Sequence, residues 1–187
     1  KLDIPKNTKS ITLELVSNNP PDIYGFVFDG QKGIQVDNYS IRGHGGSGLF
    51  NISSKYIAEQ ITKLNTHLII FQYGANVVPY IKTDKELAYL EDTYYKLFTK
   101  FKYAAPGASI LVIGVGDMAQ EVDGEFSSYP YVRKISDAQK RAALKAGCAF
   151  WDLLNIEGGL NSILKWSSSG LAAKDGHFSP KGQQLIG

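Results

Sequence analysis

The chain has 187 residues, enough for one ordinary domain. Hydrophobic residues make up 43% and charged residues 20%, which is globular composition and excludes a disordered or collagen-like chain. The 20 basic and 18 acidic residues are spread along the chain, so nucleic-acid binding is not indicated, and no apolar run is long enough for a membrane span. The single cysteine, Cys148, excludes an internal disulfide and a cysteine-based zinc site.

The first third of the chain has the pattern of strands and turns. Residues 10–16 alternate apolar Ile11, Leu13 and Leu15 with polar residues, which predicts a half-buried strand. A second strand is predicted over 23–28, after the turn residues 18–21. The chain starts at Lys1 without a signal peptide and its last residues read as an unfinished helix, so we expect it to be part of something longer.

From Gly33 onward, short apolar strands alternate with helices. The segment 67–71 is continuously apolar, as in a strand buried on both faces of a parallel sheet. This order predicts an α/β fold with a mainly parallel sheet and helices on both faces. The expected strands are 33–39, 67–71, 109–114 and 148–152, and the expected helices are 52–64, one capped by Asp84 and ending before Pro106, one of about 15 residues ending near Gly147, and one from Pro180.

Three loops that follow the strands carry candidate reactive groups: 42–48, 72–76 and 174–180. A glycine-rich turn can direct a bare backbone N–H at a developing oxyanion, and an asparagine amide can supply a second donor. A histidine with a nearby aspartate can act as a general base whose tautomer the carboxylate fixes. Taken singly, Gly43 is also explained by a tight turn, Asn76 by a turn cap and His177 by an ordinary surface histidine.

In this order the loops resemble the later motifs of the SGNH (GDSL-like) hydrolase and esterase family. The residues that carry the resemblance, which is nearest to a Bacteroidetes branch, are Gly33-Ile-Gln-Val-Asp-Asn-Tyr-Ser-Ile-Arg-Gly43, Gly74-Ala-Asn76, Gly116-Asp-Met118, Gly147-Cys-Ala-Phe-Trp-Asp152 and Asp175-Gly-His-Phe-Ser-Pro-Lys-Gly182. The resemblance implies a three-layer, flavodoxin-like α/β fold over 33–187, with the first strand missing and the last helix cut short. Residues 1–32 then resemble the tail of a β-rich, sandwich-like insert domain.

The resemblance also implies roles for individual residues. His177 is the implied general base and Asp175 its orienting partner, and Gly43 and Asn76 are the implied oxyanion donors. Gly74 keeps its loop open. Two further residues, Gly45 as a rival to Gly43 and Tyr73 as part of a sugar-binding cleft, complete the expected substrate-binding set.

The sequence departs from the family pattern in two ways. The family places aspartate three residues before the histidine, where this chain has Lys174, and Asp175 lies only two before. The nucleophile motif Gly-Asp-Ser is absent, and Ser47 is a poor substitute because its surroundings lack the glycine that a nucleophile elbow needs. Ser47 is expected to cap the following helix instead.

The missing motif has a structural consequence. In the family fold the nucleophile strand is central, and burying its five or six side chains supplies about 10 kcal/mol. A domain has a net stability of only about 5–15 kcal/mol. We therefore expect the strand and its serine to come from an upstream segment or from another polypeptide.

The predicted function is a serine esterase that removes acetyl or other small acyl groups from carbohydrate or small esters. It needs no metal or cofactor, and its location is expected to be periplasmic or secreted. The first rival is a non-catalytic carbohydrate-binding or inactive esterase-like protein. The second is nucleotide binding, because Gly114-Val-Gly116-Asp-Met-Ala119 fits a dinucleotide fingerprint if a helix begins inside it.

Overall fold

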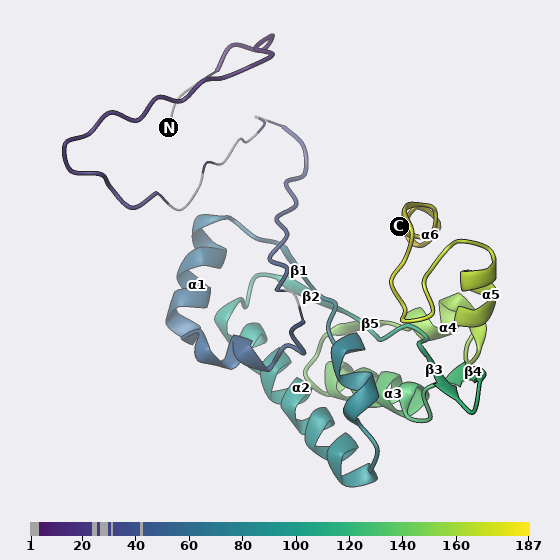
Figure 1. Cartoon of the computed structure of the whole chain (residues 1–187). Coiled ribbons are helices and arrows are strands. Elements are labelled where there is room, and N and C mark those ends of the chain that lie inside the picture. Colours follow the sequence, from purple (N-terminus) through teal and green to yellow (C-terminus); the bar gives the residue numbers. More distant parts are fainter. Residues whose placement is uncertain (1–3, 24–25, 27–29, 31, 42) are drawn as a thin grey trace. The chain divides into compact units, whose positions relative to one another are not determined.

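The chain divides into two units, Lys1–Ser40 and Ile41–Gly187. The structure is a computed structural model that describes residues 4–23, 26, 30, 32–41 and 43–187. In Figure 1 the second unit contains all the labelled helices and strands. The candidate site residues therefore all lie in Ile41–Gly187.

The strands predicted over 10–16 and 33–39 do not form, and in the described part of the first unit no residue is helix or strand. Most of the strand predicted over 23–28 lies outside the described residues. A strand is stable only when a neighbour pairs with its N–H and C=O groups, and no described residue does so here. The alternating apolar side chains stay in solvent, with Leu15 62% and Ile34 94% exposed.

The second unit is built on a three-stranded parallel sheet with the order β1-β2-β5. Its strands are β1 (Leu68–Phe71), β2 (Ser109–Ile113) and β5 (Ala149–Trp151). Leu68 pairs with Ser109 and Leu111 pairs with Ala149, so all three carboxyl ends lie at one edge of the sheet. The predicted α/β class with a parallel sheet is confirmed.

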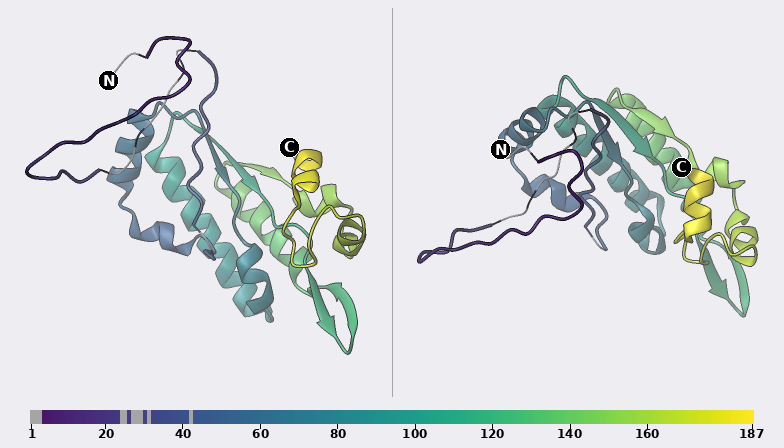
Figure 2. Two further views of the ribbon diagram at one scale, coloured as in Figure 1. Left: turned by 45° about the horizontal axis from the view of Figure 1, so that its top comes forward. Right: turned by 90° about the horizontal axis from the view of Figure 1, so that it is seen from above.

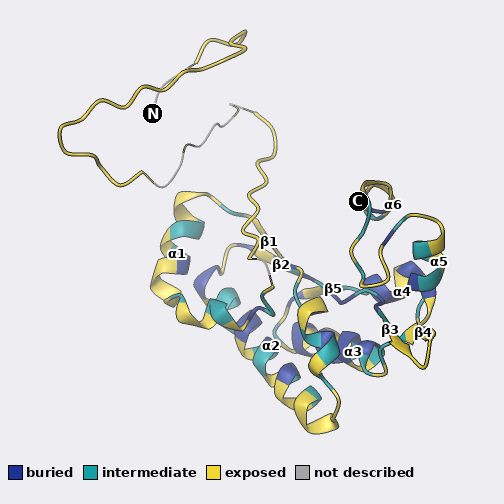
Figure 3. Ribbon diagram, viewed as in Figure 1, coloured by how far each residue is buried: buried dark blue, intermediate teal, exposed yellow. Residues whose placement is uncertain are grey.

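Two long helices cover one face of this sheet. They are α2 (Asp84–Ala104) and α3 (Val132–Lys145), which run side by side in both views of Figure 2. Alternate strand residues point at them, and Phe71, Ile110 and Val112 are almost completely buried. Figure 3 shows the buried stripes of both helices, which match the apolar periodicity of the sequence.

The other face of β1 is only partly covered. Leu68 is 52% exposed and Ile70 is 53% exposed, although both are large apolar residues of a strand. Among the described residues β1 pairs on one side only, with β2, so its other edge has free hydrogen-bonding groups. The sheet thus has an apolar face and an open edge beside β1.

Two strands were not predicted from the sequence. Residues 119–128 form a hairpin, β3 (Ala119–Val122) and β4 (Glu125–Ser128), where the sequence indicated a polar loop. Asp123 and Gly124 have positive φ angles of 52° and 83°, as a tight Asp-Gly hairpin turn requires. A dinucleotide site needs a helix at this point, so the nucleotide-binding alternative is wrong.

Two predicted helix caps are also shifted. Thr83 rather than Asp84 caps α2, in a capping box with Glu86. Ser47 makes no capping hydrogen bond and instead begins the 3-10 helix η1 (Ser47–Asn51). Ser53 caps the next helix, α1 (Ser54–Lys63), which is slightly shorter than predicted.

The remaining elements lie after the strands. They are the 3-10 helix η2 (Ala75–Tyr80) and the helices α4 (Leu153–Glu157), α5 (Ser162–Ser168) and α6 (Pro180–Ile186). Within the described residues, none of the helices combines the length and apolar character needed to cross a membrane.

Candidate active site

The glycine-rich loop and the loop after β1 lie against each other. A Cβ atom on Gly45 would stand 2.8 Å from Cγ1 of Val77, and one on Gly46 would stand 3.4 Å from the Tyr73 ring. The Tyr73 ring also meets His44 edge-on, with ring centroids 6.4 Å apart. The structure therefore brings together the two loops in which oxyanion donors were predicted.

The predicted donors in these loops are free of competing bonds. Gly43 is exposed and has a φ of 72°, a conformation that favours glycine. Neither its N–H nor that of Gly45 donates to another described residue, so the choice between them stays open. The side chain of Asn76, in the first turn of η2, is exposed and likewise bonds to no described residue, so it does not act as a turn cap.

His44 has a local role in the glycine-rich loop. Its Nδ1 lies 3.0 Å from the Gly46 nitrogen and its Nε2 lies 3.1 Å from the Gly48 nitrogen. A neutral imidazole has one acceptor nitrogen, so one of these two contacts is a hydrogen bond in a given tautomer. The half-buried ring closes the loop on itself.

The pair Asp175 and His177 lies in the loop before α6. Oδ1 of Asp175 is 3.1 Å from Nδ1 of His177 and also accepts a hydrogen bond of 3.1 Å from the backbone N–H of His177. Gly176, between them, has a φ of 87°, which turns the chain back so that an aspartate only two residues away reaches the ring. The unusual spacing is thus compatible with a carboxylate that orients the imidazole.

Burial raises the pKa of Asp175, but the hydrogen bonds from the backbone and the ring of His177 outweigh it and leave that pKa below its usual value. The carboxylate is therefore ionised at neutral pH. The His177 side chain is 86% exposed, and among the described residues only Asp175 contacts it through a polar group. Its Nε2 is free to accept a proton from a group that approaches from solvent.

The His177 loop is fastened to the segment after β2. The N–H of Ala119 donates to the Lys174 carbonyl at 2.8 Å, and Gly176 packs against Met118. Phe178 packs against Trp166 with ring centroids 5.5 Å apart and ring planes tilted by 58°, which holds the other end of the loop. His177 therefore belongs to the same carboxyl edge of the sheet as the other loops, although no hydrogen bond or ion pair between described residues joins it to Gly43 or Asn76.

Two buried carboxylates support this segment. Asp117 is fully buried and accepts hydrogen bonds from Met118, Ser128 and Ile163, which join the segment to β4 and α5. Glu157 accepts from the Asp117 N–H. Burial raises the pKa of Glu157 to about 7, against the hydrogen bond from the Asp117 backbone and with the help of the Asp117 charge.

Sequence reasoning assigned no role in the site to these carboxylates or to the buried Gln139 and Tyr94. The signal for Asp117 was a charged residue in the short apolar and glycine segment that follows a buried strand. Gln139 is a polar residue on the apolar face of α3, between Ile135 and Ala142, and this interruption of the stripe was its signal.

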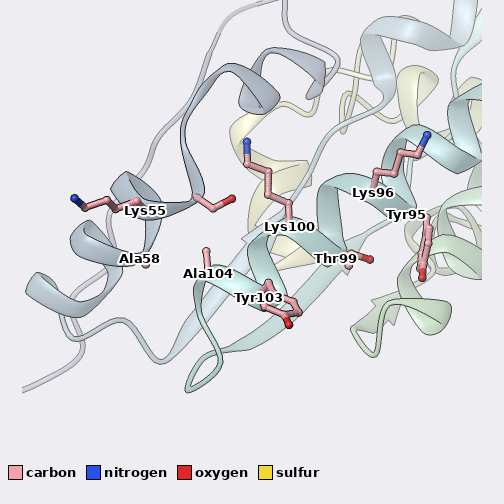
Figure 4. Close-up of a pocket in the computed structure, with 9 residues that line it drawn as sticks. Lys55, Ala58, Tyr95, Lys96, Thr99, Lys100, Tyr103 and Ala104 are labelled. Carbon is pink, nitrogen blue, oxygen red and sulfur yellow. The ribbon is translucent and has the colours of Figure 1, made fainter.

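A groove also lies between α1 and α2 (Figure 4). Its lining residues differ from every predicted site residue: Ser54, Lys55, Ala58, Tyr95, Lys96, Thr99, Lys100, Tyr103 and Ala104. The part of the groove formed by α2 is the C-terminal half of that helix, which leads into the start of β2.

Comparisons with known proteins identify the family of the chain. Residues 10–185 match the GDSL-like Lipase/Acylhydrolase family. The chain belongs to this family. No curated protein matches it. As a GDSL-like chain it is similar to a solved structure of a peptidoglycan O-acetylesterase, with 26% sequence identity and a TM-score of 0.63 over 75% of this chain. The similarity covers only 40% of the length of that esterase chain.

Proposed function

We propose that the chain is part of a serine esterase that removes acetyl or other small acyl groups from carbohydrate. The observation that carries the proposal is the Asp175–His177 pair, with its 3.1 Å contact at Nδ1 and its exposed ring. Family membership and the likeness to a peptidoglycan O-acetylesterase support ester hydrolysis, and the latter supports an acetylated carbohydrate as substrate.

In the proposed mechanism Nε2 of His177 takes the proton of a serine hydroxyl while the serine oxygen attacks the ester carbonyl. Asp175 holds the ring in the correct tautomer and stabilises the imidazolium that forms. The N–H of Gly43 or Gly45 and the Asn76 amide hold the oxyanion. The proton then passes from His177 to the leaving sugar oxygen, and water releases the acyl group by the same steps.

The nucleophilic serine is proposed to come from an upstream segment or a second polypeptide. The Gly-Asp-Ser motif is absent from the 187 residues. The open edge of β1 and the half-exposed Leu68 and Ile70 give such a strand a place to pair and apolar surface to bury. We propose that the whole protein is periplasmic or secreted, where an acetylated cell-wall carbohydrate would be accessible to it.

The test uses the whole native protein and two substrates, p-nitrophenyl acetate and an O-acetylated polysaccharide. We expect hydrolysis of both, and His177→Ala is expected to lower kcat by about 10²–10⁴-fold because the general base is lost. His67→Ala, at the opposite end of the sheet, is the matched control and keeps the wild-type rate. An unchanged rate in His177→Ala rules out the mechanism.

The same preparation locates the nucleophile. A fluorophosphonate probe labels an activated serine, and mass spectrometry of the labelled peptide identifies the segment that carries it. The intact mass shows whether this segment is on the same polypeptide. Carbohydrate binding without hydrolysis and without labelling favours the non-catalytic alternative, for which the absent Gly-Asp-Ser motif is the argument.

A further inference from the structure

Gln139 is a buried amide that joins two strand-end loops. It projects from the apolar face of α3 and is 1% exposed. Its Oε1 accepts a hydrogen bond of 2.9 Å from the N–H of Val115, and its Nε2 donates one of 2.7 Å to the carbonyl of Tyr73. A buried amide is tolerated only when both ends are bonded, and here the bonded groups directly follow β2 and β1.

Tyr94, on α2, contacts the glycine-rich loop. It is 1% exposed, and its hydroxyl donates to the carbonyl of Gly45 at 3.2 Å. Burial raises the pKa of this hydroxyl, and a side-chain hydrogen bond with Gln139 opposes the shift only in part. Tyr94 is therefore protonated at neutral pH and acts as a donor to the glycine-rich loop.

The backbone of Gly74 packs against the side chains of Gln139 and Tyr94 and leaves no room for a Cβ atom. A Cβ atom at Gly74 would stand 2.6 Å from Nε2 of Gln139, 2.6 Å from Cγ1 of Val115 and 3.3 Å from the Tyr94 hydroxyl. Asn76 follows only two residues later, in the first turn of η2. The position of the Asn76 amide is thus coupled to Gln139 through one short stretch of backbone.

We propose that Gln139 and Tyr94 are positioning residues that hold the two loops of the oxyanion hole at a fixed separation. Gln139 fixes the Tyr73–Asn76 loop and Tyr94 fixes the Gly43–Gly46 loop, from adjacent helices on the same side of the sheet. The proposal rests on the proposed esterase function. Such positioning matters for the rate, because a displacement of a catalytic group by about 1 Å lowers the rate of a reaction by about 10²-fold.

The deciding variant is Gln139→Glu, assayed with p-nitrophenyl acetate in the whole native protein. An ionised glutamate still accepts from Val115 but cannot donate to the Tyr73 carbonyl, whereas a protonated one does both. We expect kcat to be about 10²-fold below wild type at pH 8, with KM within about 2-fold. The ratio of variant to wild-type kcat is expected to rise at least about 10-fold by pH 5.5, because burial favours the protonated carboxyl.

Comparing the ratio of the two kcat values removes the pH effects that the variant and the wild type share. Tyr94→Phe deletes one hydroxyl and is expected to lower kcat about 10-fold at unchanged KM. If Gln139→Glu does not fold, the Tyr94→Phe variant tests the proposal. Ser136→Ala is the matched control on α3: its buried hydroxyl has no partner among the described residues, and kcat is expected to stay within about 2-fold.

Three results overturn the proposal. The first is a folded Gln139→Glu or Tyr94→Phe variant whose kcat equals that of the wild type at every pH. A Gln139→Glu variant whose kcat is reduced by the same factor at every pH also overturns it. The last is a wild-type protein without esterase activity, in which case the proposed function fails first. The His177→Ala variant distinguishes failure of the positioning proposal from failure of the proposed function. If the wild type hydrolyses the ester and His177→Ala does not, the esterase function is supported whatever the Gln139 and Tyr94 variants show.

Discussion

Gly74 is the residue at which the fold and the candidate site constrain each other most closely. Its φ of 122° lies where side chains are strained, and the space around it is filled by Gln139, Val115 and Tyr94. A side chain here has to displace a buried, bonded amide. The family resemblance gave this glycine the role of keeping the loop open, and the packing supplies a physical reason for a glycine at this position.

Gly74→Ala is therefore expected to lower the free energy of unfolding by about 2–4 kcal/mol, the sum of backbone strain and overpacking. Urea unfolding of the whole native protein measures this change. Gly107→Ala is the control, because position 107 has open space around a Cβ atom and an ordinary φ. Equal effects of the two substitutions contradict the packing argument.

At the scale of elements, the buried carboxylates Asp117 and Glu157 connect the segment after β2 with β4, α4 and α5. The folded-state pKa of Glu157 is about 7, well above its ordinary value of 4.5, so the native protein holds a proton there that the unfolded chain releases. Stability from this group is complete below about pH 4.5 and is lost as the pH rises towards 7.

Glu157→Gln keeps an acceptor for the Asp117 N–H but carries no charge. We expect the variant to be more stable than wild type above pH 7, on the order of 2 kcal/mol, and the difference to vanish near pH 4.5. Urea unfolding between pH 4.5 and 8.5 measures it, with Glu121→Gln on the exposed part of β3 as control. A difference that is independent of pH shows that the charge of Glu157 is not its cause.

For the whole molecule, the sheet face at Leu68 and Ile70 is the feature that sets this chain apart from a self-contained α/β domain. If the nucleophile strand pairs with the edge of β1, as proposed, Leu68 and Ile70 become part of a hydrophobic core in the whole protein. The family similarity fits this, because the chain spans only 40% of the length of the peptidoglycan O-acetylesterase it resembles.

In the whole native protein, Ile70→Ala is then expected to cost about 2–4 kcal/mol of unfolding free energy, as for a buried isoleucine. Leu144→Ala on α3 is the control, since Leu144 is 57% and Ile70 53% exposed here. Chemical denaturation of both variants gives the comparison. If the two substitutions cost the same, no strand covers β1.

The sequence alone predicted the parts of the molecule that depend on local pattern. The continuous apolar runs located β1 and β2, and an apolar stripe located α2. The alternation of these strands with helices predicted the parallel α/β sheet. The order of the motifs was enough to identify the family, because Gly74, Asn76 and His177 follow one another along the chain in the order of the family's motifs. These features are encoded in neighbouring residues, whose spacing is fixed by helix and strand geometry.

Only the tertiary structure decided what depends on residues distant in sequence. It brought Asp175 to the His177 ring through the positive φ of Gly176, and it joined Gln139 to the carbonyl of Tyr73, 66 residues away. It also decided that the alternating segment 10–16 forms no strand, because a strand depends on a partner and not on its own pattern. Periodicity shows which face of an element is apolar, whereas the group that meets this face is decided by the packing of the whole chain.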